Sequence, residues 1–210
     1  MPMRVHELHP VLIHAPLVLL PTAAAVDVIA SASSRRLRRM AFSAVGRRLW
    51  WGAAASGLVA GLSGMAASQE VEADDDARDM MLVHGLGNVM LVGGAIGLAA
   101  WRSGHRATPA SAGIGIAALL LGTYTAWLGG EMVYGHGVGV KANRSEAELR
   151  RSPPLLSRHA PGAFFTDAAK GLRWLLGRGA RAVSRKEKVR LSAISPLGES
   201  ASESHAPAVH

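Results

Sequence analysis

Four apolar segments of nearly equal length constrain the fold of this chain more than any other feature. They cover residues 11–32, 49–68, 80–101 and 110–130. Each holds about 20 residues, the length that a helix needs to cross a hydrocarbon core about 30 Å thick. Because hydrocarbon offers the backbone no water to bond with, each segment has to be helical. We therefore predict an all-α fold in which residues 5–140 form a polytopic membrane four-helix bundle.

The small residues of these segments favour close helix packing. Alanine and glycine are abundant, whereas Phe, Trp and Tyr together number ten. This composition is typical of helices that approach one another closely in lipid. The pairs Gly57–Gly61 and Gly93–Gly97 have the GxxxG spacing, and we expect helix packing at both. The chain has no cysteine, which excludes disulfides and thiolate metal sites.

The positive charge of the chain is concentrated after the last apolar segment. Residues 141–210 hold thirteen basic and six acidic residues, whereas residues 1–140 hold ten and nine. We predict a basic, partly disordered tail that faces anionic lipid, and we expect no nucleic-acid partner. Residues 163–183 mix apolar and basic side chains, which favours either an interfacial helix in the headgroup plane or a partly disordered segment. Residues 192–210 are rich in Ser, Ala and Pro and are predicted to be disordered.

Charges in the short connections predict the orientation. Six arginines and no acid lie between the first two apolar segments, whereas residues 69–79 hold six acids and one arginine. The positive-inside rule places the first and third connections in the cytoplasm, and both termini outside, in a bacterial cytoplasmic membrane. The basic tail then lies outside too, which is tolerated because long segments translocate largely regardless of charge.

Histidines and one glutamate gather at a single end of the predicted bundle. His9 and His14 begin the first segment, His84 begins the third, and Glu131 and His136 follow the fourth. Antiparallel segments bring these positions to one membrane face, the outer one in the predicted orientation. Imidazoles from facing helices can ligate haem iron or a transition metal.

These residues form the predicted site. The candidate cofactor-binding residues are His14, His84, Glu131 and His136, with His14 and His84 as axial ligands of haem b. The candidate ligands of a transition metal are His9, His14 and His84. A hydrogen-bonded polar network without any ligand is the competing interpretation.

Asp27 is the acid inside the first apolar segment. An ionisable residue at membrane depth marks a functional site unless it is paired or lies close to the interface. We predict that Asp27 lies near the cytoplasmic end of its helix, close enough to the interface to form hydrogen bonds there or to pair with Arg47 or Arg48.

Three motifs at the polar end resemble those of a known family. HPVLIHAP at residues 9–16, HGLGN at 84–88 and AWLGGEMVYGHGVGV at 126–140 are similar to the DUF2231 family, a set of predicted bacterial four-helix membrane proteins of unknown function. The resemblance covers about residues 5–140. The chain departs from the family pattern at Ala15, where Phe is frequent, and at Gly135, where Arg is frequent. The second departure removes a charge that an anion-binding role beside His136 would use.

The resemblance implies redox or quinone-linked work, because some family members are joined to Rieske iron–sulfur domains. This chain lacks the cysteines that a Rieske centre needs. The leading hypothesis is therefore a small membrane protein with a redox, haem or metal site. The alternative is a non-catalytic membrane scaffold or accessory subunit whose histidines hold helix ends together, and a transporter built from two copies is third. No motif assigns an enzymatic reaction; the expected partners are the lipid bilayer, a redox protein or membrane subunit, and a second copy.

Overall fold

The protein is built from helices. The computed structural model describes residues 3–140 and 153–196, and 80% of these residues are helical with no strand among them. The prediction of an all-α fold is confirmed. In chain order the helices are η1 (Val5–Glu7), α1 (Leu8–Leu12), α2 (His14–Ala32), α3 (Arg36–Glu70), α4 (Asp75–Gly104), α5 (Pro109–Tyr134), α7 (Ala160–Val183) and α8 (Leu191–Ile194).

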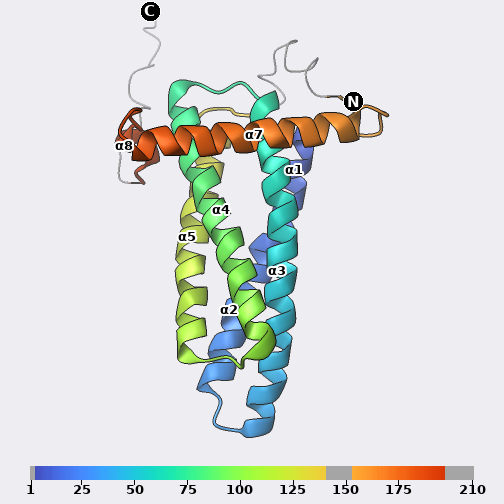
Figure 1. The fold of residues 1–210 in the computed structure, drawn as a ribbon, viewed down its shortest axis with the longest axis vertical. Helices are drawn as coiled ribbons and strands as arrows, with labels where there is room; N and C mark the ends of the chain where they lie inside the picture. The colour runs from blue at the N-terminus through green and yellow to red at the C-terminus, as the bar shows by residue number, and fades with distance from the viewer. Residues whose placement is uncertain (1–2, 141–152, 197–210) are drawn as a thin grey trace, which may run out of the picture.

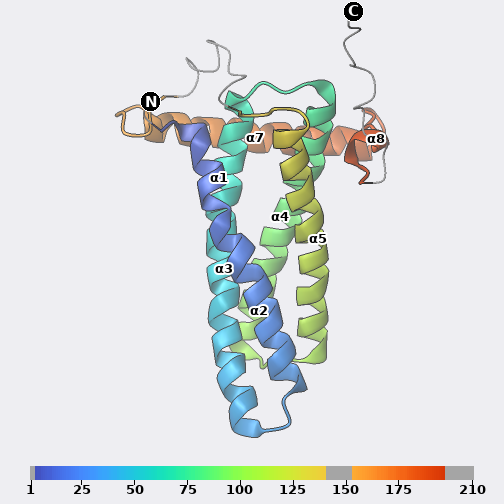
Figure 2. The same cartoon turned by 180° about the vertical axis from the view of Figure 1, so that it is seen from behind.

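Helices α2, α3, α4 and α5 run side by side in alternating directions (Figures 1 and 2). Each contacts the next, and α5 returns to contact α2. Three helical stretches among the described residues are long and apolar enough to cross a membrane: Leu8–Ala32, Asp75–Gly104 and Pro109–Tyr134. The remaining predicted span, residues 49–68, lies within α3; it carries no charge, but its glycines, serines and tryptophans make it less apolar.

The helices extend beyond the predicted apolar segments. Helix α3 begins at Arg36, so most of the arginine-rich stretch predicted to be a connection is helical. Arginine is a good helix former, and a helix that leaves the bilayer no longer needs apolar side chains. The acidic connection is also shorter than predicted, because α3 ends at Glu70 and α4 already begins at Asp75. Asp74 caps α4 by accepting a hydrogen bond from the Ala77 N–H at 2.7 Å.

A break at Ile13 divides the first apolar segment into α1 and α2. Pro16 accounts for this break, because proline has no N–H to donate to the Leu12 carbonyl and its ring conflicts with that carbonyl. His9 and His14 lie on opposite sides of this position, and their five-residue spacing puts their side chains about 140° apart around the helix axis.

Alanines pack around one indole in the space enclosed by α2, α3, α4 and α5. Trp50 is 1% exposed and lies in a cluster with Ala23, Ala24, Ala54, Ala95, Leu98 and Ala99. Gly115 completes the packing, because a Cβ there would lie 3.1 Å from the Cβ of Ala24 and 3.3 Å from Cζ2 of Trp50. Small residues thus bring α2 and α5 close together around the indole of α3.

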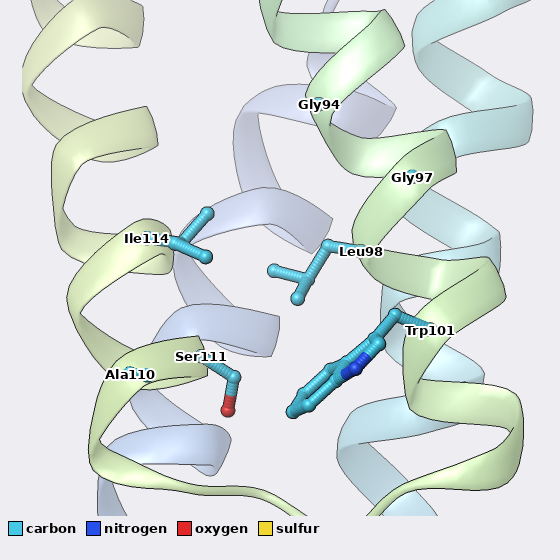
Figure 3. A pocket seen from close by; sticks show the side chains of 7 residues that line it. All are labelled: Gly94, Gly97, Leu98, Trp101, Ala110, Ser111 and Ile114. Atoms are coloured by element: carbon cyan, nitrogen blue, oxygen red, sulfur yellow. The ribbon is translucent and has the colours of Figure 1, made fainter.

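The two GxxxG pairs do not both serve this packing. Gly57 is buried, and a Cβ there would lie 3.1 Å from Val92. A Cβ at Gly61, Gly93 or Gly97 would meet open space. Gly97 instead faces an apolar crevice between α4 and α5 of about 300 Å³ (Figure 3), which Gly94, Leu98, Trp101, Ala110, Ser111 and Ile114 also line. The expectation of helix packing at Gly93–Gly97 is therefore wrong for the described part of the chain.

The residues after the bundle include a long helix that crosses it. Helix α7 lies across α3 and α4 near the end of the bundle where the chain begins (Figure 1). It starts three residues before the segment 163–183 that the sequence marks as a possible helix. The short α8 packs near α5, where the Tyr124 hydroxyl donates to the Ile194 carbonyl at 2.7 Å. Most of the stretch 192–210 predicted to be disordered, and residues 141–152, lie outside the described residues.

Candidate functional site

Two polar clusters lie at opposite ends of the bundle. One contains His84 near the start of α4, and the other contains Arg102 near its end. The 18 residues between them span about 27 Å at 1.5 Å per residue, close to the thickness of about 30 Å of a hydrocarbon core. Each cluster therefore lies near one boundary of a membrane that the bundle would cross.

The first cluster joins two imidazoles from helices far apart in the sequence. The ring centres of His9, from α1, and His84, from α4, are 6.4 Å apart, and the ring planes are perpendicular at 89°. His9 Nδ1 lies 3.0 Å from the Ala60 carbonyl oxygen and 3.4 Å from Ser63 Oγ, both on α3. His84 Nδ1 lies 2.8 Å from the Thr125 carbonyl oxygen on α5. Two helices, α1 and α4, thus supply the rings, and two others, α3 and α5, supply their hydrogen-bond partners.

The hydrogen bonds determine the tautomer of both rings. A carbonyl oxygen can only accept, so Nδ1 carries the proton in each imidazole. In a neutral ring the lone pair is then on Nε2. A backbone carbonyl that orients the N–H of one ring nitrogen, leaving the other nitrogen as donor, is the usual surrounding of a histidine that ligates a metal.

Glycines make room for both rings. A Cβ at Gly64 would lie 2.9 Å from Cε1 of His9, and one at Gly129 would lie 3.3 Å from Cε1 of His84. Gly87, one turn beyond His84, allows α4 to approach Thr125, whose Cγ2 would be 2.6 Å from an added Cβ. Gly129 belongs to the motif at 126–140, so this part of the motif has a packing role beside His84.

Other predicted site residues lie elsewhere. His14 is exposed, and its Nδ1 donates to the Val11 carbonyl of α1 at 3.1 Å, across the break at Ile13. His136 Nδ1 lies 2.9 Å from Asp74 Oδ2, at the connection between α3 and α4. The Glu131 carboxylate points toward Gly135, just past the end of α5. The expected convergence of His14 with His84 is therefore not found, and His9 lies beside His84 instead. Positions 9 and 14 are five residues apart, which is about 140° around a helix, so the two side chains face different sides.

The Asp74–His136 pair lies outside the apolar spans, and the contacts around it change the pKa of the Asp74 carboxyl group. Burial raises the pKa of Asp74, but hydrogen bonds from the Ala77 N–H and from His136 outweigh this effect, so its pKa is below the usual value. This pair joins the start of α4 to the turn that follows α5. It borders a second hollow of about 280 Å³ lined by residues 72–74, 136, 137, 139 and 140.

The second cluster is a buried ion pair near the opposite end. Arg102 Nε donates to Asp27 Oδ2 at 2.9 Å, and Nη2 donates to Asp27 Oδ1 at 2.9 Å, with both side chains 0% exposed. The same Nη2 donates to the Ser43 carbonyl at 3.0 Å and to Ser43 Oγ at 3.1 Å. The Trp50 indole N–H donates to Asp27 Oδ2 at 3.1 Å. The network joins α2, α3 and α4.

The sequence left Asp27 either to hydrogen-bond at the interface or to pair with Arg47 or Arg48; in the structure it pairs with Arg102, and Arg47 and Arg48 are exposed. Arg102 directly follows the apolar segment that ends at Trp101, a position compatible with burial. Arg48 directly precedes another apolar segment, so the sequence could not single out Arg102. A bidentate pair satisfies both charges in a region without water, which supports a structural role.

The described residues hold no group of three or more His, Asp or Glu placed to bind one metal ion. The chemically apt donors are the two Nε2 atoms of His9 and His84. Two imidazoles bind copper, zinc or iron, and two is also the number of axial ligands of a haem. With further ligands from a bound molecule, this donor set suits a single metal ion; neither the crevice beside Gly97 nor the hollow beside His136 lies between the rings, so a haem would need additional space.

Together, the apolar helices of membrane length and the polar clusters near their ends define a helical membrane protein. The sequence profile of one family, described as "predicted membrane protein (DUF2231)", matches residues 5–142. The chain belongs to the DUF2231 family, as its motifs indicated. No curated protein and no solved structure matches it.

Proposed function

We propose that the protein is a four-span protein of the bacterial cytoplasmic membrane in which residues 49–68 of α3 form the second span. The buried Trp50 at the start of this span supports the proposal, because its N–H donates to Asp27 of α2 and its ring packs against alanines of α2 and α4, two of the apolar helices. The exposed arginines at the start of α3 mark that end as cytoplasmic under the positive-inside rule. The end with His9, His84 and α7 is then the outer face.

We further propose that His9 and His84 form a transition-metal site at this outer face, and that a redox-active metal there would supply one-electron chemistry. The observation that carries the proposal is the ring separation of 6.4 Å. A metal held at about 2.0–2.1 Å by two imidazole nitrogens places the ring centres about 6 Å apart. The fixed Nδ1–H groups further favour ligation through Nε2.

Haem b is the larger candidate for the same ligands. Two axial imidazoles would hold its iron at a similar ring separation. The macrocycle would need space between α1 and α4 that single metal ions do not need. The visible absorption spectrum separates the two groups, since haem has an intense Soret band.

The test uses the full chain, expressed with haem precursor and metals supplied and purified in detergent. Metal content and the visible spectrum are measured for the wild type, His9→Ala, His84→Ala and the matched control His14→Ala, whose ring is exposed. We expect a bound metal or haem that both site substitutions abolish and the control retains. A metal-free, colourless wild type, or an equal loss in His14→Ala, would contradict the proposal.

The scaffold hypothesis has its own supporting observation. His9 connects α1 to α3, and His84 connects α4 to α5, each by one hydrogen bond to a backbone carbonyl. If the two rings act only as braces, His9→Ala and His84→Ala lower the thermal stability of a metal-free protein, whatever is supplied during expression.

A further inference from the structure

Helix α7 has an exposed apolar stripe beside the face that it buries. Its buried residues Ala168, Gly171, Leu175 and Gly179 face the bundle. The stripe consists of Phe165, Leu172, Leu176 and Val183, which are 66%, 39%, 54% and 86% exposed. These four lie seven, four and seven residues apart and therefore share one side of the helix.

Contacts with α4 establish how α7 is rotated. Arg178 donates to the carboxylate of Asp79 and to the Arg78 carbonyl, near the start of α4. A Cβ on the neighbouring Gly179 would lie 3.4 Å from Leu86. Leu86 lies seven residues after Asp79, about 10 Å farther along α4, which is the diameter of a helix. The Arg178 side of α7 thus faces the end of the bundle, and the Gly179 side faces its apolar middle.

The stripe continues around α7 from the Gly179 side. At 3.6 residues per turn, Leu172, Leu176 and Val183 lie just beyond Gly179 when one moves around the helix away from Arg178. The axis of α7 lies across one end of the spans (Figure 1). The stripe is therefore on the side of α7 that faces the other end of the bundle, at the level of the apolar spans.

Basic residues surround the remaining sides of α7. Arg178 and Arg190 are engaged by the acids of α4, since Arg178 pairs with Asp79 and Arg190 pairs with Asp75 at 3.1 Å and with Asp76. Between Ala160 and Arg190 there are two acids, Asp167 and Glu187. The exposed basic residues in the same range are Lys170, Arg173, Arg181, Arg185, Lys186 and Lys188. Positive charge thus remains in excess at the level where α7 meets the spans.

We propose that α7 lies in the headgroup layer of the membrane, with its apolar stripe among the acyl chains and its exposed basic residues on the phosphates of anionic phospholipids. An interfacial helix has this division into an apolar side and a basic side. Trp174, whose ring lies 5.5 Å from the Arg178 guanidinium, suits the same layer. The proposal rests on the membrane-spanning placement of the bundle and is independent of any metal at His9 and His84.

The environment of the stripe can be measured directly, because the chain has no native cysteine. Leu176→Cys and Arg173→Cys are each labelled with a nitroxide in the full chain, reconstituted in vesicles of phosphatidylcholine and phosphatidylglycerol. Both positions are exposed in the structure. We expect the label at 176 to collide mainly with oxygen and the label at 173 mainly with a water-soluble nickel chelate. A label at 176 that resembles the one at 173, or that is shielded from both reagents, would overturn the proposal.

A second measurement tests the preference for anionic lipid. The association of spin-labelled phosphatidylglycerol and phosphatidylcholine is compared for the wild type and the triple variant Lys170→Gln/Arg173→Gln/Arg181→Gln. A basic residue near an anionic surface contributes about fivefold to association, so the triple variant should lower the preference for phosphatidylglycerol by at least about fivefold. The matched variant Arg173→Lys/Arg181→Lys conserves charge and should retain it. An unchanged preference in the glutamine variant would show that these residues do not bind anionic lipid.

Discussion

Replacing Arg102 by methionine should severely destabilise the bundle. The substitution leaves the Asp27 carboxylate at 0% exposure with the Trp50 N–H as its remaining hydrogen-bond donor among the described residues. Breaking a buried ion pair by removing one partner costs about 3–5 kcal/mol, which is more than about a hundredfold in the unfolding equilibrium constant. The Ser43 carbonyl and hydroxyl also lose the Nη2 donor.

The double variant Asp27→Leu/Arg102→Met separates charge from packing. Replacing both members of a buried pair by apolar groups of similar volume is neutral or stabilising by about 1–4 kcal/mol in known cases. Here the lost bonds to Ser43 and Trp50 offset part of that gain, at about 1 kcal/mol each. We therefore expect the double variant to be more stable than Arg102→Met alone.

The assay is unfolding by SDS in mixed micelles, followed by far-ultraviolet circular dichroism. Arg106→Met is the matched control, because Arg106 is exposed in the same connection, and surface changes of this kind stay within about 0.5 kcal/mol. If Arg102→Met lies within about 1 kcal/mol of this control, or if the double variant is the less stable one, the reasoning on the ion pair fails.

Three further predictions test the remaining contacts. Gly64→Ala should displace the His9 ring and weaken metal binding or stability, whereas Gly61→Ala, which meets open space, should do neither; metal analysis and thermal unfolding of both variants check this. The lowered pKa of Asp74 means that its ionised form stabilises the fold above the unfolded-state pKa and that this contribution is lost as pH falls through the lowered folded-state pKa; the stability difference between wild type and Asp74→Asn should therefore be present at neutral pH and vanish in strong acid. Reporter fusions at Arg38 and Asp75 should indicate the cytoplasm and the exterior, and the reverse pattern would invert the proposed orientation.

Some features of the fold follow from local patterns in the sequence alone. The helices of the first, third and fourth predicted spans follow directly from hydropathy, because a long apolar run in lipid has one way to satisfy its backbone. The end of the bundle that carries His9 and His84 follows from antiparallel order. The helical start of α3 was missed, because its arginines indicate the edge of the membrane but do not end a helix.

The side-chain partners depended on rotation and long-range packing. His9 and His14 are five residues apart, about 140° around a helix, so only one of them can face His84, and the packing of the first helix selects His9. Asp27 meets Arg102 across 75 positions, and several arginines near the same membrane boundary were equally compatible with the sequence. The docking of α7 needs Gly171 and Gly179 to meet Met65 and Leu86, contacts that a helical pattern in the tail does not specify.

The sequence by itself therefore determined the helical membrane class, the family and the end of the bundle at which the histidines gather, because hydropathy and short motifs act locally along the chain. Only the tertiary structure decided that His9 rather than His14 faces His84, that Arg102 neutralises Asp27, and that α7 turns its apolar stripe along the spans. Those choices depend on the rotation of each helix about its own axis. That rotation is set by contacts between helices distant in sequence, such as those at Gly64, Gly87 and Gly179, and no local pattern encodes it.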